Sequence, residues 1–389
     1  MKLTISSIAF MVWLIAALLP AQAASPPRIP SAMAIDAHVR TLLNETGARG
    51  LALAVIDGGK VLYVHAYGVR NERGDPLQSD TIMYGASLTK TVMAYTTLRL
   101  VDAGKLTLDG RIVDIIEPPM PSGNVYDSLV TDARWRELTP RIILTHSTGL
   151  ANFAFVEPDH KLQFHFAPGT RYAYSGDGIN LLQFALEHGR KDAGLGFDLG
   201  EYAQVSVFAP LGMSRTSLRW RDDFAANLAD GWDDAGHLTP HDARSNVRAA
   251  GSMDTTIADL ARFAAALVSG TGLSANARAE LVKPQVHITT RTQFPTLQPE
   301  LPPDQQRKDL YAGLGVVTFK GPQGPGFYKG GHNEITANTL ICVKAGRRCL
   351  LILSNDVRSE AGFASLVRFV LGEIGAPYDW EYGDRAGKS

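Results

Sequence analysis

Strand-like segments stand at both ends of this chain, and a long helix-rich segment separates them. Leu51–Ile56 and Val61–Tyr67 are apolar runs joined by Asp57-Gly58-Gly59-Lys60, a pattern typical of a β-hairpin. Further β-rich runs lie at residues 312–319, 338–344 and 349–353, and a final amphipathic helix is predicted at 360–374. Helical apolar spacing marks residues 87–103, 179–187 and 257–267. This order predicts one sheet built from both chain ends, with a helical subdomain inserted between them.

The N-terminus has the order of residues that is typical of an export signal. Lys2 precedes the apolar stretch Ile8–Leu19, and Pro20-Ala21-Gln22-Ala23-Ala24 follows it. An uncleaved membrane anchor is the alternative, but the apolar run is short for ~30 Å of hydrocarbon. We therefore predict cleavage after Ala23 and an exported protein, periplasmic or secreted, without stable membrane insertion.

These signals divide the chain into a signal peptide (1–23), a linker (24–34) and a single functional domain (35–380). Within this domain we assign residues 35–86 and 305–380 to the sheet subdomain and 87–304 to the helical subdomain. The segment 284–303 is rich in proline, and we interpret it as a flap near a site or as a variable loop.

Composition excludes some classes of partner and cofactor. The chain has 389 residues and a formal net charge of −1, and its basic residues form no run longer than a pair, so we expect no nucleic-acid partner. Two cysteines, Cys342 and Cys349, could form a disulfide between neighbouring strands or remain two buried thiols. Ten histidines show no metal-ligand spacing, so we expect no metal and no cofactor. The sequence does not indicate an oligomeric state.

Ser87 and Lys90 form the strongest candidate for chemistry. Residues three apart on a helix share a face, and this pair lies where a loop gives way to a helix. A serine hydroxyl needs a base, which a lysine can supply if burial and nearby positive charge lower its pKa. A solvated serine and a surface lysine are the alternative, but the apolar residues Val92–Tyr95 indicate a buried helix.

Two later segments carry further candidates. Tyr174 precedes the predicted helix at 179–187 and could relay protons if nearby lysines depress its pKa; the alternative is a packing tyrosine. Lys329-Gly330-Gly331 offers a cation beside a backbone that a ligand can approach closely; the alternative is a hairpin turn with a solvated lysine.

Ser-x-x-Lys, then Tyr-Ser about 85 residues later, then Lys-Gly-Gly near the C-terminal end resembles the serine β-lactamase and penicillin-binding protein superfamily. Its class C-like branch, which includes D-aminopeptidases, D-Ala-D-Ala carboxypeptidases and esterases, is the most similar. Further segments that resemble it are Leu138–Leu150, Pro210–Met213, Ala249–Ser252 and Asp259–Phe263. The resemblance covers residues 35–375 and implies an α/β (α+β) fold, with an antiparallel sheet flanked by helices.

The resemblance also implies a role for each matching residue. Ser87 is the expected nucleophile, Lys90 its base or proton relay, Tyr174 the second proton-transfer group, and Lys329 a positive charge for the tyrosine and a substrate carboxylate. The backbone N–H groups of Ser87 and His332 are the expected oxyanion hole. Further expected substrate-binding positions are Gly330, Gly331, Ser175 and Asn333, whereas His146 is interpreted as structural.

Two positions depart from the family pattern. Gly176 stands two residues after the tyrosine, where many relatives have an asparagine, and Gly330 replaces the threonine of Lys-Thr-Gly. Both changes weaken the case for β-lactam turnover. We predict a serine hydrolase that forms an acyl-enzyme with small esters, D-amino-acid amides or peptides, or β-lactams. The alternative is a penicillin-binding sensor or a cell-wall-fragment-binding module without efficient turnover.

Overall fold

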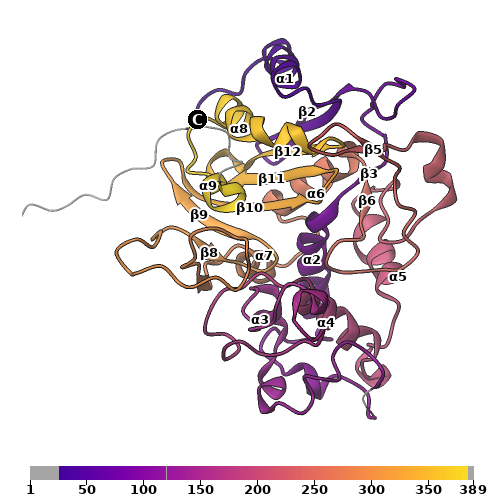
Figure 1. Ribbon diagram of the computed structural model, residues 1–389, viewed down its shortest axis with the longest axis vertical. Coiled ribbons are helices and arrows are strands. Elements are labelled where there is room, and N and C mark those ends of the chain that lie inside the picture. The colour runs from indigo at the N-terminus through magenta and orange to yellow at the C-terminus, as the bar shows by residue number, and fades with distance from the viewer. Residues whose placement is uncertain (1–25, 120, 384–389) are drawn as a thin grey trace, which may run out of the picture.

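An eight-stranded sheet joins the two ends of the chain in the computed structural model, which describes residues 26–119 and 121–383. Its strands are β1 (Gly50–Asp57), β2 (Lys60–Gly68), β7 (Val286–His287), β8 (Tyr311–Ala312), β9 (Val317–Gly321), β10 (Gly324–His332), β11 (Ala337–Val343) and β12 (Arg348–Ser354). The order is β2-β1-β12-β11-β10-β9-β8-β7, and every neighbouring pair is antiparallel (Figure 1). The fold class predicted from the sequence is confirmed. The predicted signal peptide lies outside the described residues.

Both faces of the sheet are covered by helices. Alternate residues of β1 separate between two cores: Leu51, Leu53 and Val55 join one, and Ala52, Ala54 and Ile56 the other. The first core includes α1 (Ala32–Thr46) and α8 (Phe363–Leu371), and the second includes α2 (Thr89–Asp102) and α6 (Ile257–Ser269). Burial on both faces explains why β1 is apolar without alternation.

Some element boundaries differ from the prediction. The run 312–319 is divided between β8 and β9 by a turn in which Gly313 N donates to Val316 O. The predicted helix 360–374 begins with a 3-10 turn (Val357–Gly362) and continues as the shorter α8. α1 begins at Ala32, inside the predicted linker, because the Ser31 side chain caps its first turn. α6 comes from the segment assigned to the helical subdomain, yet it packs on β1, β2 and β12.

The remaining helices lie mainly below the sheet in the view of Figure 1. They are α3 (Pro140–Leu144), α4 (Gly176–Glu187), α5 (Leu199–Ala203) and α7 (Ala275–Leu281). Two short strand pairs, β3 (Met83–Tyr84) with β6 (Asp254–Thr255) and β4 (Gly231–Trp232) with β5 (Leu238–Thr239), connect segments of the middle region. A last helix, α9 (Tyr378–Tyr382), closes the described chain. No helix among the described residues is both long enough and apolar enough to cross a membrane.

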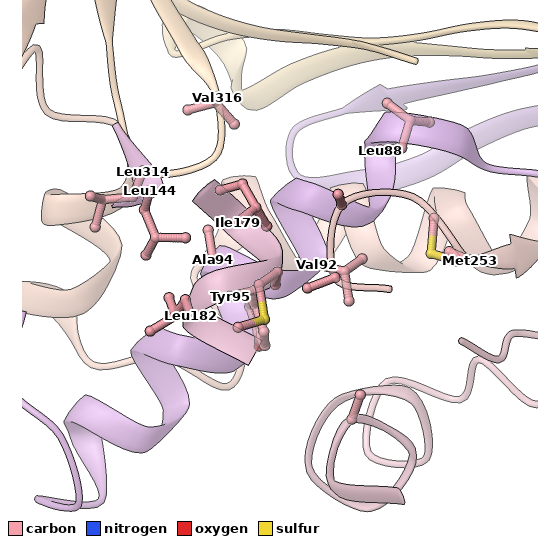
Figure 2. Close-up of a cluster of buried hydrophobic side chains, with 14 of the residues drawn as sticks. Leu88, Val92, Ala94, Tyr95, Leu144, Ile179, Leu182, Met253, Leu314 and Val316 are labelled. Carbon is pink, nitrogen blue, oxygen red and sulfur yellow. The ribbon is translucent and has the colours of Figure 1, made fainter. Parts of the chain in front are cut away.

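α2 is buried along most of its length, and this burial fixes the place of Ser87 and Lys90. Figure 2 shows Val92, Ala94 and Tyr95 of this helix among side chains of α3, α4 and the loop before β9. Gly315 allows the loop before β9 to approach the backbone of α2 closely, because a Cβ at this position would lie only 2.6 Å from the Lys90 carbonyl oxygen. The Gly315 carbonyl accepts from Thr91 Oγ1 (2.9 Å). The loop thus ties the start of α2 to the edge of the sheet.

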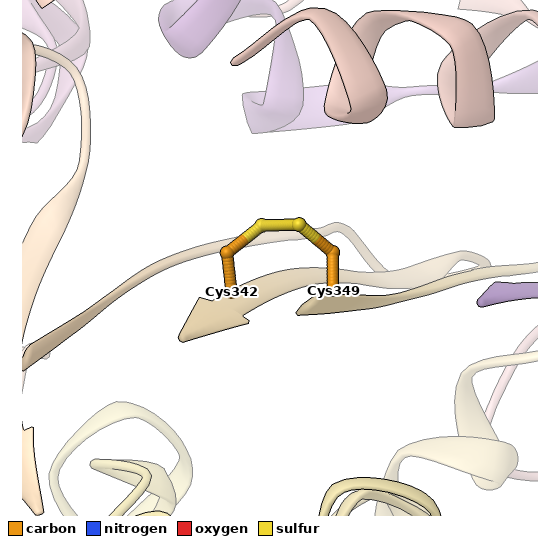
Figure 3. Close-up of a disulfide and its surroundings, with 2 residues drawn as sticks. All are labelled: Cys342 and Cys349. Carbon is orange, nitrogen blue, oxygen red and sulfur yellow. A yellow bond between two sulfur atoms is a disulfide. The ribbon is translucent and has the colours of Figure 1, made fainter. Parts of the chain in front are cut away.

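Cys342 and Cys349 are joined by a disulfide, with 2.05 Å between the two sulfur atoms. The two residues stand directly opposite each other on β11 and β12, so neighbouring strands bring them together (Figure 3). The sequence left open a disulfide or two buried thiols, and the structure contains the disulfide.

Candidate active site

A cavity of about 830 Å³ contains the four predicted catalytic side chains, Ser87, Lys90, Tyr174 and Lys329. Its walls come from the start of α2, the loop before α4, the end of β10 and the loops of residues 229–252. Gly330, Gly331, His332 and Asn333 also line it, as expected for substrate-binding positions. Ser87 and Lys329, which are 242 positions apart in the chain, therefore meet in one place, since the sheet joins both ends of the chain.

The backbone at Ser87 has an uncommon conformation. Ala86 has a φ of 46°, in the left-handed region that a non-glycine residue seldom adopts, and a 3-10 turn (Ala86–Leu88) leads into α2. Thr89 Oγ1 donates to the Ala86 carbonyl (2.6 Å) and accepts from Met253 N (3.1 Å). These contacts hold the turn that presents Ser87 to the cavity. Backbone strain of this kind is frequent at active sites.

Two polar side chains converge on the Ser87 hydroxyl. Lys90 Nζ lies 2.9 Å from Ser87 Oγ, and the Tyr174 hydroxyl donates to the same oxygen at 2.7 Å. Lys90 Nζ also donates to the Ala250 carbonyl (2.6 Å), which orients the amine. A nucleophile, a basic amine and a phenol are therefore all within hydrogen-bonding distance of one oxygen atom.

Lys90 has the properties of a base. Its side chain is buried, and burial, followed by the positive charge of Lys329, lowers its pKa well below the ordinary value; Asp177 acts weakly in the other direction. The lowered pKa favours the uncharged amine, which has a free electron pair. In this form Lys90 can accept the Ser87 proton across the 2.9 Å contact.

Tyr174 differs from the expectation based on its sequence neighbours. Burial raises its pKa well above the ordinary value, and the Ser87 hydrogen bond only partly opposes this effect. The expected depression by nearby lysines is wrong, although Lys90 Nζ and Lys329 Nζ lie 4.7 Å and 5.1 Å from the ring centroid. The reason is that desolvation of a phenolate outweighs these charges. Tyr174 is consequently a proton donor, with its hydroxyl directed at Ser87 Oγ.

Lys329 lies on β10, with its ammonium inside the cavity. Burial lowers its pKa to about 8, and the nearby Glu381 opposes this shift. Its Nζ donates to the Gly330 carbonyl (2.5 Å). Glu381 comes from α9, is buried and lines the cavity. Sequence reasoning missed Glu381 because no motif connects it to Lys329 and only the packing of α9 brings the two together.

β10 passes directly beside the nucleophile. A Cβ at Gly331 would lie 3.1 Å from Ser87 N and 3.0 Å from Leu88 N, so a side chain here would require the neighbouring backbone to shift, and glycine fits without such a shift. His332 follows and lines the cavity. The pair of N–H groups predicted as an oxyanion hole, those of Ser87 and His332, thus belongs to two segments in close contact.

Two neighbours of Tyr174 have structural positions. Ser175, which we predicted to bind substrate, does not line the cavity. Its hydroxyl instead donates to the Ala151 carbonyl (2.7 Å) and accepts from Gly178 N (2.9 Å), so that Ser175 caps α4. His146 stacks on Tyr174 (4.4 Å between centroids), and its Nδ1 accepts from Ser175 N (3.1 Å). Burial, then the charges of Lys90 and Lys329, lower the pKa of His146 well below the ordinary value. It supports the tyrosine loop, as we expected.

Asn152 and Phe153 occupy the space beside Gly176. A Cβ at 176 would collide with the Phe153 ring and lie 3.2 Å from Asn152 Oδ1. Asn152 Oδ1 accepts from Gly176 N (2.9 Å), and both Asn152 and Phe153 line the cavity. An amide is therefore present next to the position where the sequence lacks one, supplied by another loop. Only the fold reveals it, since residue 152 is 22 positions from Tyr174 in the chain.

The proline-rich segment 284–303 contributes Gln293 and Phe294 to the cavity wall. The Phe294 ring packs edge-on against Tyr174 (5.4 Å) and His332 (5.9 Å). The sequence left open whether this segment lies near the site or is only a variable loop, and the structure places it at the site. Among the described residues, no group of three or more His, Cys, Asp or Glu side chains is arranged to hold a metal ion.

Comparison with known proteins identifies the family. The family model described as Beta-lactamase matches residues 35–371. A monacolin J acid methylbutanoyltransferase of Aspergillus terreus is 29% identical over 201 residues, which cover 44% of this chain and 48% of that protein. A lovastatin esterase of Penicillium rubens is 27% identical over 230 residues (50% of this chain and 56% of that protein). This chain thus spans about half the length of the curated relatives it matches.

Solved structures with the same fold include D-alanine carboxypeptidase AmpC of Burkholderia cenocepacia. It is 17% identical, with a TM-score of 0.66, and the match covers 86% of this chain and 97% of that one. Class C β-lactamases and a penicillin-binding protein homologue share the fold as well. The predicted family and its class C-like architecture are confirmed.

Proposed function

Because the chain belongs to the Beta-lactamase family, we propose that it is a serine hydrolase that forms an acyl-enzyme at Ser87. One observation carries the proposal: Lys90 Nζ and the Tyr174 hydroxyl both lie within hydrogen-bonding distance of Ser87 Oγ, at 2.9 Å and 2.7 Å. Burial favours the uncharged form of both groups, an amine that can accept a proton and a phenol that can donate one. Such a pair can remove a proton and return it.

In the acylation step, neutral Lys90 accepts the Ser87 proton while Oγ forms a bond to the substrate carbonyl carbon. The carbonyl oxygen becomes an oxyanion, which the N–H groups of Ser87 and His332 stabilise. When the bond to the leaving group breaks, Tyr174 protonates the departing atom and regains a proton from Lys90. In deacylation, water loses a proton to this same pair and attacks the acyl carbon, and Ser87 recovers its proton.

Small esters, D-amino-acid amides or peptides, and β-lactams are the candidate substrates. Relatives named as an esterase and as an acyl transferase favour ester chemistry. Gly176 and Gly330 lack side chains with which many family members contact their substrates, and this supports an esterase or peptidase-like hydrolase over a dedicated β-lactamase. We propose no cofactor.

A penicillin-binding sensor or cell-wall-fragment-binding module is the second candidate. A solved structure with the same fold is named as a penicillin-binding protein, which is the reason to retain this candidate. A module that only binds has no need of a buried base on the serine, so the Lys90 contact favours the hydrolase.

We also propose that the protein is exported to the periplasm or secreted. The order of residues at its N-terminus and the Cys342–Cys349 disulfide support this location, since disulfides persist in oxidising compartments.

A covalent probe and two substrates test the proposal. A fluorophosphonate should label the wild-type protein and Ser365→Ala, an exposed control, but not Ser87→Ala. Nitrophenyl butyrate should be hydrolysed only by the two proteins that label. Labelling of Ser87→Ala at the wild-type rate would disprove the assignment of the nucleophile. Labelling that depends on Ser87 without any turnover of esters or nitrocefin would favour the sensor.

Tyr174→Phe tests the proton-transfer role. We expect kcat to fall by at least ~10²-fold, as for the loss of a general acid. Tyr202→Phe, a tyrosine outside the cavity lining, is the matched control. Unchanged single-turnover rates for acylation and deacylation in Tyr174→Phe would remove this residue from the mechanism.

A further inference from the structure

Glu381 is a buried carboxylate inside the cavity for which the proposed mechanism has no use. It lies on α9, is 5% exposed, and lines the cavity together with Lys329, Tyr174 and Ser87. Buried carboxylates are rare unless a positive charge or hydrogen bonds stabilise them. Its presence beside a reaction site therefore calls for a functional explanation.

The departure from Lys-Thr-Gly at position 330 is explained by this carboxylate. Any Cβ at Gly330 would collide with Glu381 Oε1 and with the Tyr328 hydroxyl. The space that the threonine side chain would need is thus occupied by a glutamate from α9. Position 330 therefore has no hydroxyl that could donate to a substrate carboxylate. In its place lies the Glu381 carboxylate, which would repel a substrate carboxylate and accept a hydrogen bond from a neutral donor.

Glu381 and Lys329 both lie close to Gly330. The Lys329 ammonium donates to the Gly330 carbonyl, and the Glu381 carboxyl group is in contact distance of the Gly330 Cα region. The effect of Glu381 on Lys329 is that of a negative charge, since it raises the pKa of the lysine against the effect of burial. The surrounding aromatic groups, Tyr172, Tyr328, Tyr378 and Tyr382, all have raised pKa values and carry no compensating charge.

We propose that Glu381 is a specificity-determining residue that offsets the charge of Lys329 and so directs the site to substrates without a carboxylate at this end. The inference rests on the proposed function and specifies its substrate class: uncharged esters or amides. A carboxylate that approached the Lys329 ammonium would also approach Glu381, and repulsion between the two would cancel much of the attraction. A neutral group meets no such repulsion.

A pair of esters that differ only by one charge tests this inference. The substrates are 3-(butanoyloxy)benzoate and its methyl ester, which have the same acyl group and the same reacting bond. Wild type should prefer the methyl ester. Glu381→Gln should raise kcat/KM for the anionic ester relative to the neutral one by about tenfold. Most of this change should be in KM, because binding rather than chemistry is altered.

Two further variants separate charge from structure. Glu381→Asp keeps the charge and should keep the wild-type ratio, whereas Glu381→Gln keeps the shape and should change it. Asp379→Asn, an exposed position on the same helix that pairs with Arg307, is the control and should leave the ratio unchanged. Circular dichroism at 222 nm, the wavelength of helical signal, checks that each variant is folded.

A double mutant shows whether Glu381 acts on the substrate directly. Adding Glu381→Gln to Lys329→Met should still raise the ratio, because the repulsion between Glu381 and the substrate carboxylate does not require Lys329. An equal fall in kcat/KM for both esters in Glu381→Gln would mean a structural role and overturn the inference. An unchanged ratio would also overturn it, and acceptance of the anionic ester would then be assigned to Arg244 and Arg248 on another wall of the cavity. Ser87→Ala distinguishes failure of this inference from failure of the proposed function. If Ser87→Ala still hydrolyses the neutral ester, the proposed function itself is wrong.

Discussion

Lys90 and Lys329 are two buried lysines in one cavity, and they differ in what surrounds them. Their residues are 1% and 4% exposed, and both ammonium groups lie near the Tyr174 ring. Lys90 is on a helix, directed at Ser87 and the Ala250 carbonyl. Lys329 is on a strand, beside Gly330 and the carboxylate of Glu381.

This difference gives the same side chain two functions. Asp177 raises the pKa of Lys90, but burial and then the repulsion by Lys329 have the larger effects and lower it well below the ordinary value. Glu381 limits the fall of the Lys329 pKa, which remains at about 8. The stronger depression of its pKa favours Lys90 as the proposed base, whereas a pKa of about 8 keeps most of Lys329 positively charged at neutral pH. Burial lowers both pKa values, and the nearby carboxylate of Glu381 contributes to the difference between them.

Removing the base should have the largest effect. We expect Lys90→Met to lower kcat by about 10³-fold, because Ser87 then has no group that can accept its proton. Lys283→Met, an exposed lysine that pairs with Glu280, is the matched control. Rapid-quench measurement of acylation would show the loss directly. A rate within about threefold of wild type would mean that Lys90 is not the base.

The pH dependence should distinguish the second lysine from the first. Lys329 loses its proton as pH rises through about 8, and with it the attraction for a substrate carboxylate, so kcat/KM for the anionic 3-(butanoyloxy)benzoate should fall severalfold above that pH. This alkaline limb should be absent in Lys329→Met. In Glu381→Gln it should move to lower pH, because Glu381 raises the pKa of Lys329. A limb that persists unchanged in Lys329→Met belongs to another group.

The smallest expected effect is on stability. The pKa of Lys90 is lower in the folded protein than its value of 10.5 in the unfolded chain. Lys90 therefore destabilises the folded protein fully at pH values below its folded-state pKa, and this penalty shrinks as pH rises from there to 10.5. Lys90→Met should therefore increase the free energy of unfolding at pH 7, by about 1 kcal/mol after loss of the hydrogen bond to Ala250. The gain should shrink at pH 10. Urea unfolding at the two pH values measures it, and a gain that is independent of pH would contradict this explanation.

Local patterns in the sequence were sufficient to predict the fold class and the helical turn that joins Ser87 to Lys90. Apolar runs joined by a turn motif identified β1 and β2, and 3.6-residue apolar spacings identified α2, α4 and α6, because the helical period follows directly from backbone geometry. The predicted strand boundaries were wrong where a tertiary contact divides an apolar run. The run 312–319 is one example, because Gly315 approaches the Lys90 carbonyl and a turn there separates β8 from β9. Ser175 was misassigned because a capping hydroxyl and a substrate-binding hydroxyl look alike in a motif.

What the sequence determined by itself is the set of candidate reacting groups, Ser87, Lys90, Tyr174 and Lys329, since their motifs stand in a fixed order along the chain. The tertiary structure alone decided their chemical states and their surroundings. Burial raised the pKa of Tyr174 where neighbouring lysines suggested the opposite, and folding brought Asn152 beside Gly176 and Glu381 beside Gly330. The physical reason is that desolvation and charge proximity depend on distances in space, which residues far apart in sequence acquire only when the chain is packed.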